Sequence, residues 1–245
     1  VSDLNGKPLD ANPFKDVRVR QALSLAVNRE ALVRSIMRGK AVATNTIISD
    51  SVFGYDPRIA QTGQYDLQKA KALLKEAGFE NGFAFTLDTS NNRWVNDENL
   101  CKALAGMWAK LNVKVNVHSM PRTQYFPKVL SFDTSAGLVG WGSSTFDAFY
   151  PLQSLSATYD GTSGAGISNI GRASDKQMDA LLKKLNLAED LSEREAIARQ
   201  ALSLEQKRVL HIPLLQPMFS WAMKKNIDPI VRPDNKLTLE WIVMH

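Results

Sequence analysis

A strand–helix–strand pattern between residues 83 and 118 constrains the fold of this chain more than any other feature. Apolar residues alternate with smaller or polar ones over residues 83–87 and again over residues 113–117, the period of a strand. Between them, apolar side chains recur at helical spacing, at Leu100, Leu104, Met107, Trp108 and Leu111. A helix that crosses over between two neighbouring strands makes them parallel. The pattern therefore predicts an α/β layer with parallel pairing.

Helix signals precede this unit. Asp16 can cap a helix whose apolar stripe consists of Val19, Ala22, Leu23 and Ala26, and we expect that helix to end at Gly39. A second helix is predicted from Asp66 to Gly78. The intervening residues 41–63 lack helical periodicity, which predicts a long irregular or strand-containing connection.

Further helices are predicted in the last third of the chain. One carries the apolar face Met178, Leu181, Leu182 and Leu185. Another starts at a capping box formed by Ser192 and Glu195. Residues 137–141 can form a buried strand, and residues 211–215 a strand with an edge-type proline. The long Ser-, Thr- and Gly-rich stretch 142–174 is typical of a functional or mobile loop.

Composition limits the class of protein. The chain has 245 residues, of which 44% are hydrophobic and 22% charged, enough for one large or two small cores. No apolar run reaches the roughly 18–20 residues of a membrane span, and no signal-peptide pattern begins at Val1. The net charge of +5 is spread along the chain without a nucleic-acid motif, so we expect no nucleic-acid partner.

Catalytic and metal signals are weak. The single cysteine, Cys101, excludes an intramolecular disulfide. The three histidines, His118, His211 and His245, are isolated in the sequence, which favours structural roles over metal ligation. No short catalytic or phosphate-binding motif occurs. We therefore expect a protein that is not an enzyme and uses no cofactor or metal.

One segment is far more specific than its amphipathic pattern. Residues 12–30, NPFKDVRVRQALSLAVNRE, resemble the "NPP-F-x-D-x-RVRQA-L-x-x-A-x-(D/N)-R-E" segment of the peptide-type (oligopeptide, dipeptide and nickel class) extracellular solute-binding proteins of ABC transporters. Four further stretches resemble the same family in the same order, at residues 65–79, 140–141, 175–182 and 212–214. Together these stretches extend the resemblance over most of the chain, roughly from residue 8 to residue 221.

The resemblance implies a periplasmic-binding-protein architecture, in which two lobes enclose a ligand. Residues 1–208 would form the second lobe, a mixed sheet flanked by helices, and residues 209–245 a return segment that belongs to a missing first lobe. The implied function is capture of peptides or peptide-like solutes in an inter-lobe cleft for uptake through ABC permease subunits, in the periplasm or outside the cell. The alternatives are a receptor of the same family for a sugar, opine or metal chelate, and an isolated lobe that self-associates and binds no ligand.

The resemblance also points to a ligand-binding loop that follows Gly140. Its glycine allows close backbone approach, its hydroxyls offer adaptable hydrogen bonds and its tryptophan a flat apolar wall. The members are Trp141, Gly142, Ser143, Ser144 and Thr145. The family has an aspartate, which pairs with the ligand's α-amino group, where this chain has Ser144; Asp147 can substitute for it. A plain Gly/Ser turn with Trp141 in the core is the alternative interpretation.

Two further pairs complete the candidate site. Arg93 and Trp94 lie in a predicted strand-to-helix loop, a common place for ligand contacts in α/β folds, where Arg93 can pair with a carboxylate or phosphate. By resemblance, Asn169 and Arg172 line the cleft. For each residue a solvated surface position is the alternative. Arg18 and Arg20 are expected to bridge to another part of the structure rather than to touch ligand.

Overall fold

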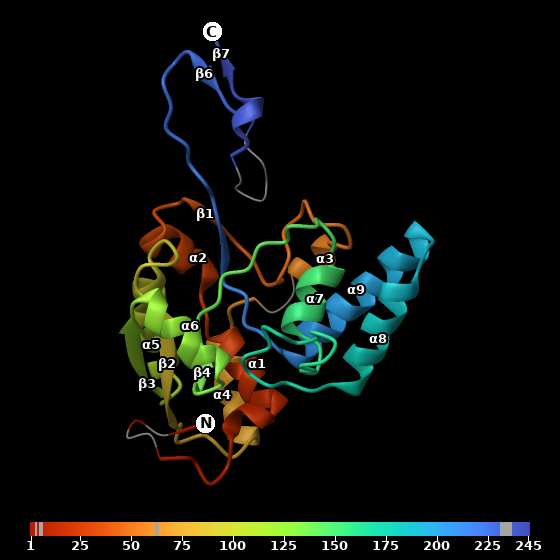
Figure 1. The fold of residues 1–245 in the computed structure, drawn as a ribbon. Coiled ribbons are helices and arrows are strands. Elements are labelled where there is room, and N and C mark those ends of the chain that lie inside the picture. The colour runs from red at the N-terminus through yellow and green to blue at the C-terminus, as the bar shows by residue number, and fades with distance from the viewer. Residues whose placement is uncertain (3, 5–6, 62–63, 231–236) are drawn as a thin grey trace.

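A computed structural model of the chain describes residues 1–2, 4, 7–61, 64–230 and 237–245. A three-stranded parallel sheet lies along one side of the molecule (Figure 1). Its central strand β2 (Ala84–Ser90) pairs with β3 (Lys114–Met120) on one side and with the short β4 (Ala136–Gly137) on the other. Helix α5 (Asp97–Ala109) connects β2 to β3. The predicted α/β class and the predicted parallel pairing are confirmed.

The two faces of the sheet carry different helices. α5 packs on one face, where the Phe85 and Trp108 rings lie 5.9 Å apart. α6 (Arg122–Leu130) packs on the other face and forms a small cluster with the end of β3. The main core continues from α5 to the packed pair α1 (Val17–Leu25) and α4 (Leu67–Glu76), and its buried members include Val19, Ala22, Leu23, Leu74, Phe85, Leu104 and Trp108.

A second hydrophobic cluster is mainly helical. It lies between α7 (Phe149–Leu155), α8 (Lys176–Leu187) and α9 (Leu191–Arg208), with the short α3 (Pro57–Ala60) against α9. The buried apolar residues of this cluster include Val52, Leu152, Met178, Leu182, Leu185, Ile197 and Leu202. The α8 face predicted from the sequence is thus confirmed as a core face.

The last part of the chain leaves the body of the molecule. β5 (Leu215–Pro217) pairs antiparallel with β1 (Ala41–Ala43). Beyond it, a small antiparallel hairpin of β6 (Ile227–Asp228) and β7 (Val243–Met244), with the 3-10 helix η3 (Leu239–Trp241), projects away from both core clusters (Figure 1). Many large apolar side chains there are exposed: Met218, Phe219, Trp221, Met223, Ile230, Leu237, Leu239, Trp241, Val243 and Met244.

Side-chain caps fix two predicted helix starts. The Asp16 carboxylate accepts a hydrogen bond from the Arg18 amide at the start of α1, and that of Asp66 accepts one from the Lys69 amide at the start of α4. Gly78 follows α4 with φ 81°, as expected of a helix-ending glycine. A 3-10 turn, η1 (Pro13–Lys15), precedes α1.

The first predicted helix is wrong in its extent. α1 ends at Leu25, and a new helical segment begins at α2 (Arg29–Ala31) and continues as the π-helical turn η2 (Leu32–Ile36). The break arises because the Asn28 side chain accepts the Ala31 amide and caps a second helix in competition with continuation of the first. Gly39, with φ 76°, ends this second segment.

Three other predicted element boundaries need correction. The capping box at Ser192 and Glu195 does not form, because Asp190, two residues earlier, accepts the Glu193 amide and starts α9. The strand predicted at 137–141 is limited to Ala136–Gly137 and is only partly buried. The strand predicted at 211–215 starts at Leu215.

The two regions predicted to be irregular contain short elements. Within 142–174 the helix α7 forms, and within 41–63 both β1 and α3 form; Thr62 and Gly63 lie outside the described residues. In the described parts of the chain, no helix has the length and apolar character required to cross a membrane. Cys101 is buried in α5, and burial raises the pKa of its thiol to about 11.

Candidate functional site

Loops that follow the carboxyl ends of the parallel strands form the candidate site. Residues 91–96 connect β2 to α5, and residues 138–147 follow β4. Because β2 and β4 are parallel neighbours, both loops leave the sheet at the same edge. This edge is where open α/β sheets usually bind ligands.

Trp94 and Gly140 join the two loops. A Cβ atom added to Gly140 would lie 2.3 Å from Nε1 of Trp94, so the indole occupies the space that any larger residue would need. The ring is held edge-on against Tyr125 and Phe126 of α6, with centroids 6.1 Å away in each case. The sequence placed Trp94 and Gly140 in separate motifs; the structure brings them into contact.

A buried carboxylate stabilises the first loop. Asp97 is 3% exposed, and its Oδ2 accepts hydrogen bonds from Ser90 Oγ at 2.6 Å and from the Arg93 and Trp94 amides at 3.2 Å. Asn96, at φ 59°, donates from its side chain to the carbonyl of Ile36. The negative charge at this position is therefore used within the loop.

Arg93 is the exposed cation of this loop. Its guanidinium lies 5.5 Å from the centroid of the Trp94 ring, and no carboxylate of the described residues lies within 4.0 Å of it. A cation held beside an aromatic face at a strand's carboxyl end is suited to an anionic group.

The second loop presents an aromatic pair and small polar residues. Trp141 packs on Tyr150 with ring centroids 5.5 Å apart, and its Nε1 is buried without a hydrogen-bond partner in the part of the chain that is described. Gly142, Ser144 and Thr145 are exposed. Trp141 is thus only partly buried, so its position agrees fully neither with an open ligand-binding wall nor with a core residue.

Asp147 and Ser143 point back into the protein. The Asp147 carboxylate pairs with Arg194 of α9 at 3.0 Å and accepts the Phe149 amide at 2.7 Å, while Ser143 Oγ donates to the Asp147 carbonyl. The acid that could replace the family's aspartate is therefore already neutralised.

Asn169 serves as a clamp inside its own loop. It is 2% exposed; its Nδ2 donates to the carbonyls of Ala157 and Ala173 at 2.9 and 2.8 Å, and its Oδ1 accepts the Ala173 amide. These bonds use the amide's polar atoms within the protein. Its predicted role in ligand binding stays a prediction.

Arg172 stacks between aromatic rings. Its guanidinium lies 3.5 Å from the Phe132 centroid and 4.5 Å from that of Tyr159. Both Arg172 and Phe132 have positive φ, 50° and 62°, conformations that L residues rarely adopt. The stack ties the loop after α7 to the turn between α6 and β4, and Arg172 remains exposed.

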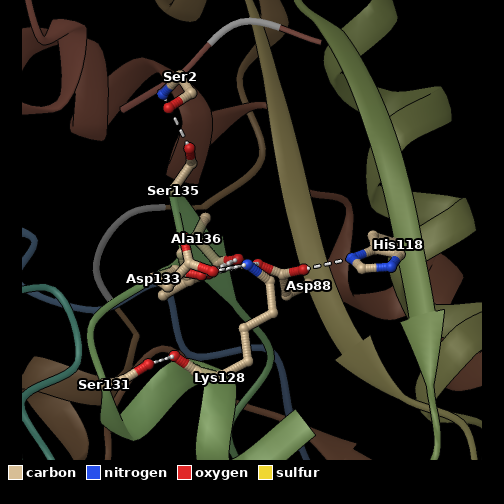
Figure 2. A network of polar contacts seen from close by, with 9 residues as sticks. Ser2, Asp88, His118, Lys128, Ser131, Asp133, Ser135 and Ala136 are labelled. Carbon is tan, nitrogen blue, oxygen red and sulfur yellow. Dashed lines mark hydrogen bonds and ion pairs between the residues drawn. The ribbon is translucent and has the colours of Figure 1, made fainter. Parts of the chain in front are cut away.

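A polar network around Asp88 of β2 connects this strand to β3, to α6 and to the turn that precedes β4 (Figure 2). Asp88 is 1% exposed and bonds to Thr134 Oγ1 at 2.7 Å and to His118 Nδ1 at 2.9 Å. Lys128 lies 3.8 Å from the same carboxylate and also binds the side chain and carbonyl of Asp133. The network fixes the α6–β4 turn and hence the start of the 138–147 loop.

Sequence reasoning missed this network, although one signal was present. An acid at position 88, in the middle of an apolar strand pattern, requires a buried partner. The other two histidines also face acids: His211 lies 3.1 Å from Glu205, and His245 lies 2.9 Å from Asp228. Among the described residues, no group of three or more potential metal ligands occurs.

A family model matches most of the chain. Residues 3–163 match the model described as bacterial extracellular solute-binding proteins, family 5 middle. Heme-binding protein A of Haemophilus influenzae is 29% identical over 211 residues, covering 82% of this chain and 37% of that protein. The dipeptide-binding protein of Escherichia coli K12 is 27% identical over 229 residues, covering 89% of this chain and 42% of that protein.

A solved structure agrees in fold. The dipeptide-binding protein of Pseudoalteromonas sp. SM9913, in complex with Met-Leu, superposes with a TM-score of 0.80 at 22% identity, covering 95% of this chain and 46% of that one. The chain spans less than half the length of the relatives it matches. The match to the family model over residues 3–163 shows that the chain belongs to family 5 of the bacterial extracellular solute-binding proteins.

Proposed function

We propose that this chain is one ligand-binding lobe of a receptor that captures peptides or peptide-like solutes for an ABC importer. The contact between Trp94 and Gly140 carries the proposal, because it joins two loops into one surface at the edge where α/β sheets bind ligands. The receptor acts without catalysis, in the periplasm or outside the cell, and hands its solute to permease subunits. A dipeptide-binding relative and a dipeptide-bound structural neighbour support this class of solute.

The proposed division of the chain follows the same idea. Residues 1–208 form the lobe, and residues 209–245 return to a first lobe that the rest of the receptor supplies. The exposed apolar side chains of residues 218–244 support this division, because a water-exposed cluster of that kind normally contacts another protein surface. Residues 209–217 still pack on the body of this lobe.

Binding by lobe closure predicts a weak interaction for the single lobe. Each lobe contributes part of the contacts, and the ligand shifts a hinge equilibrium toward the closed form. We therefore expect the 245-residue chain alone to bind dipeptides with a Kd of about 1 mM or weaker, measured by isothermal titration calorimetry. A submicromolar Kd would contradict the two-lobe proposal.

The charges of the site favour one kind of peptide end. Arg93 is exposed and unpaired among the described residues, whereas Asp97 and Asp147 are both used internally. A ligand carboxylate facing Arg93 gains a charge-assisted hydrogen bond, but a free ammonium finds no open carboxylate in these two loops. We propose that the solute presents a carboxylate here and that its amino end is blocked, modified or bound elsewhere.

Matched ligands test this in the complete receptor. A dipeptide, its N-acetylated form and its C-terminal amide would be compared by calorimetry. Acetylation should change Kd by less than about threefold, whereas amidation and Arg93→Met should each weaken binding at least about tenfold. Lys183→Met, on the exposed face of α8, is the matched control. Strict dependence on a free N-terminus would contradict the assignment. Native mass spectrometry of the receptor from its host would identify the carried solute.

A further inference from the structure

A second cavity lies apart from the candidate site. It lies between α1, α4 and the C-terminal end of α9, has a volume of about 370 Å³, and shares no lining residue with the 91–96 and 138–147 loops. This volume is within the range of about 300–1,000 Å³ common for small-molecule sites. The cavity lies where the two hydrophobic clusters of the lobe meet.

Glu205 places a buried carboxylate in this cavity. Its side chain is 2% exposed, and its Oε1 accepts hydrogen bonds from the backbone amide and Nδ1 of His211 at 3.2 and 3.1 Å. Its Oε2 bonds to none of the described residues. Oε2 is not one of the fully enclosed atoms that lack a partner, so it is accessible from the cavity and can accept a hydrogen bond from a bound molecule.

The rim of the cavity has the opposite charge. Lys69 of α4 and Lys207 of α9 are exposed lining residues, and neither has a carboxylate of the described residues within 4.0 Å. The buried residues Ser24 and Asn45, each 7% exposed, also line the cavity. The lining therefore combines two exposed cations with one buried carboxylate, whose Oε1 is already bonded to His211.

We propose that this cavity binds a small zwitterion of the α-amino-acid type. The ammonium donates to Oε2 of Glu205, and the carboxylate lies toward Lys69 and Lys207. A simple amine would leave the two lysines unmatched, and a simple carboxylate would approach the buried Glu205 charge without neutralising it. Only a molecule with both charges satisfies both kinds of charge in the lining. This site is separate from the proposed inter-lobe site and does not depend on it.

Titration of the 245-residue chain followed by amide NMR tests the proposal. L-alanine should produce saturable shifts at Ser24, Glu205 and Lys207. Methylamine, which has only the cation, and acetate, which has only the anion, should each bind at least about tenfold more weakly. Equal binding of acetate or methylamine would overturn the zwitterion assignment. Shifts that do not saturate, or that occur only in residues 91–96 and 138–147, would overturn the site.

A matched pair of variants isolates the carboxylate. Glu205→Gln keeps the shape of the side chain and should weaken L-alanine binding at least about tenfold, while Glu193→Gln, exposed on the same helix, should leave it unchanged. Circular dichroism checks the fold of each variant. If Glu205→Gln does not fold, Lys69→Met is the deciding variant, because a substitution of this exposed side chain should leave the fold intact. The proposal requires Lys69→Met to bind L-alanine severalfold more weakly. Unchanged affinity in Lys69→Met would overturn it.

Discussion

Arg29 donates from Nε to the carbonyl oxygen of Pro213 at 2.7 Å, joining residues 184 positions apart. Arg20 of the same segment donates to the carbonyls of Arg208 and Val209 at the end of α9. The last carbonyls of a helix lack partners within the helix, and the Arg20 guanidinium supplies donors at the end of α9. The predicted bridging role of Arg20 is confirmed, and Arg18 likewise reaches the carbonyl of Glu76.

Removal of the Arg29 guanidinium should destabilise the lobe. Arg29 is 8% exposed, and its group also donates to the Ser24 carbonyl and hydroxyl; burial lowers its pKa to about 10. Arg29→Met leaves these acceptors without a donor, so we expect a loss of about 2–3 kcal/mol in the free energy of unfolding, measured in urea. Arg34→Met, at an exposed position, should stay within about 0.5 kcal/mol. Equal stability of the two variants would contradict a stabilising role for the Arg29 hydrogen bonds.

Gly140→Ala should disturb the contact between the two loops. Its added methyl group would meet Trp94 at 2.3 Å, and the indole is packed against α6. We expect a loss of about 1–3 kcal/mol in thermal unfolding, with a changed tryptophan fluorescence spectrum. Gly142→Ala, two residues on, has nothing within 4 Å of its new Cβ and should leave both measurements unchanged. A neutral Gly140→Ala would show that the loops are not in contact.

Asp56 should contribute to the loss of stability of the folded chain at low pH. Its carboxylate caps α3 and pairs with Arg58 at 2.6 Å, and hydrogen bonds from the Arg58 side chain lower the pKa of Asp56 to about 2. The folded pKa lies below the unfolded value of about 3.9, so the stabilisation is complete above about pH 4 and is lost as the pH falls toward 2.

The Asp56 effect is measured by urea unfolding across this range. Asp56→Asn should lower stability at pH 7 by no more than about 1 kcal/mol, because the Arg58 partner is largely exposed to water. The difference from the unsubstituted chain should shrink between pH 4 and pH 2. Asp50→Asn, exposed in the preceding loop, is the control. A difference that does not change with pH would contradict the assigned ion pair.

Residues 218–245 should cause the isolated chain to associate. The described residues after Pro217 expose large apolar side chains, among them Trp221, Leu239 and Met244. We expect light scattering to detect concentration-dependent oligomers of the full chain and a monomer after truncation behind Pro217. Circular dichroism of the truncated chain should retain the helical signal, because both core clusters end before this point. A monomeric full chain would contradict the proposed exposed interface.

The sequence predicted the elements whose signals are local. The strand–helix–strand unit around α5, the caps at Asp16 and Asp66, and the apolar face of α8 all depend on spacing over a few residues. The helix α6 was missed because Pro127 lies in its interior, where a proline normally ends a helical pattern, and α7 was missed because it has only 7 residues.

The geometry of the candidate site could be predicted only in part. Resemblance selected the loop after Gly140, and the strand-to-helix pattern selected the loop of Arg93 and Trp94, but the contact of Trp94 with Gly140 depends on tertiary packing that spacing does not encode. The same holds for Asp147, whose charge is neutralised by Arg194, 47 residues away. Family resemblance identifies positions in a motif; it does not report which polar atoms the protein has already used.

The pairing of β1 with β5 affects the order in which the lobe is assembled during synthesis. The strand Ala41–Ala43 pairs with Leu215–Pro217, so it can pair only after these residues have left the ribosome. The hydrogen bond from Arg29 to the carbonyl of Pro213 likewise forms only after Pro213 has been synthesised. The local unit around α5 can form much earlier, since its contacts are close in sequence. We therefore expect the 213–217 segment to dock late in the folding of the lobe, and a nascent chain stalled before this segment would expose the edge of β1 to other proteins.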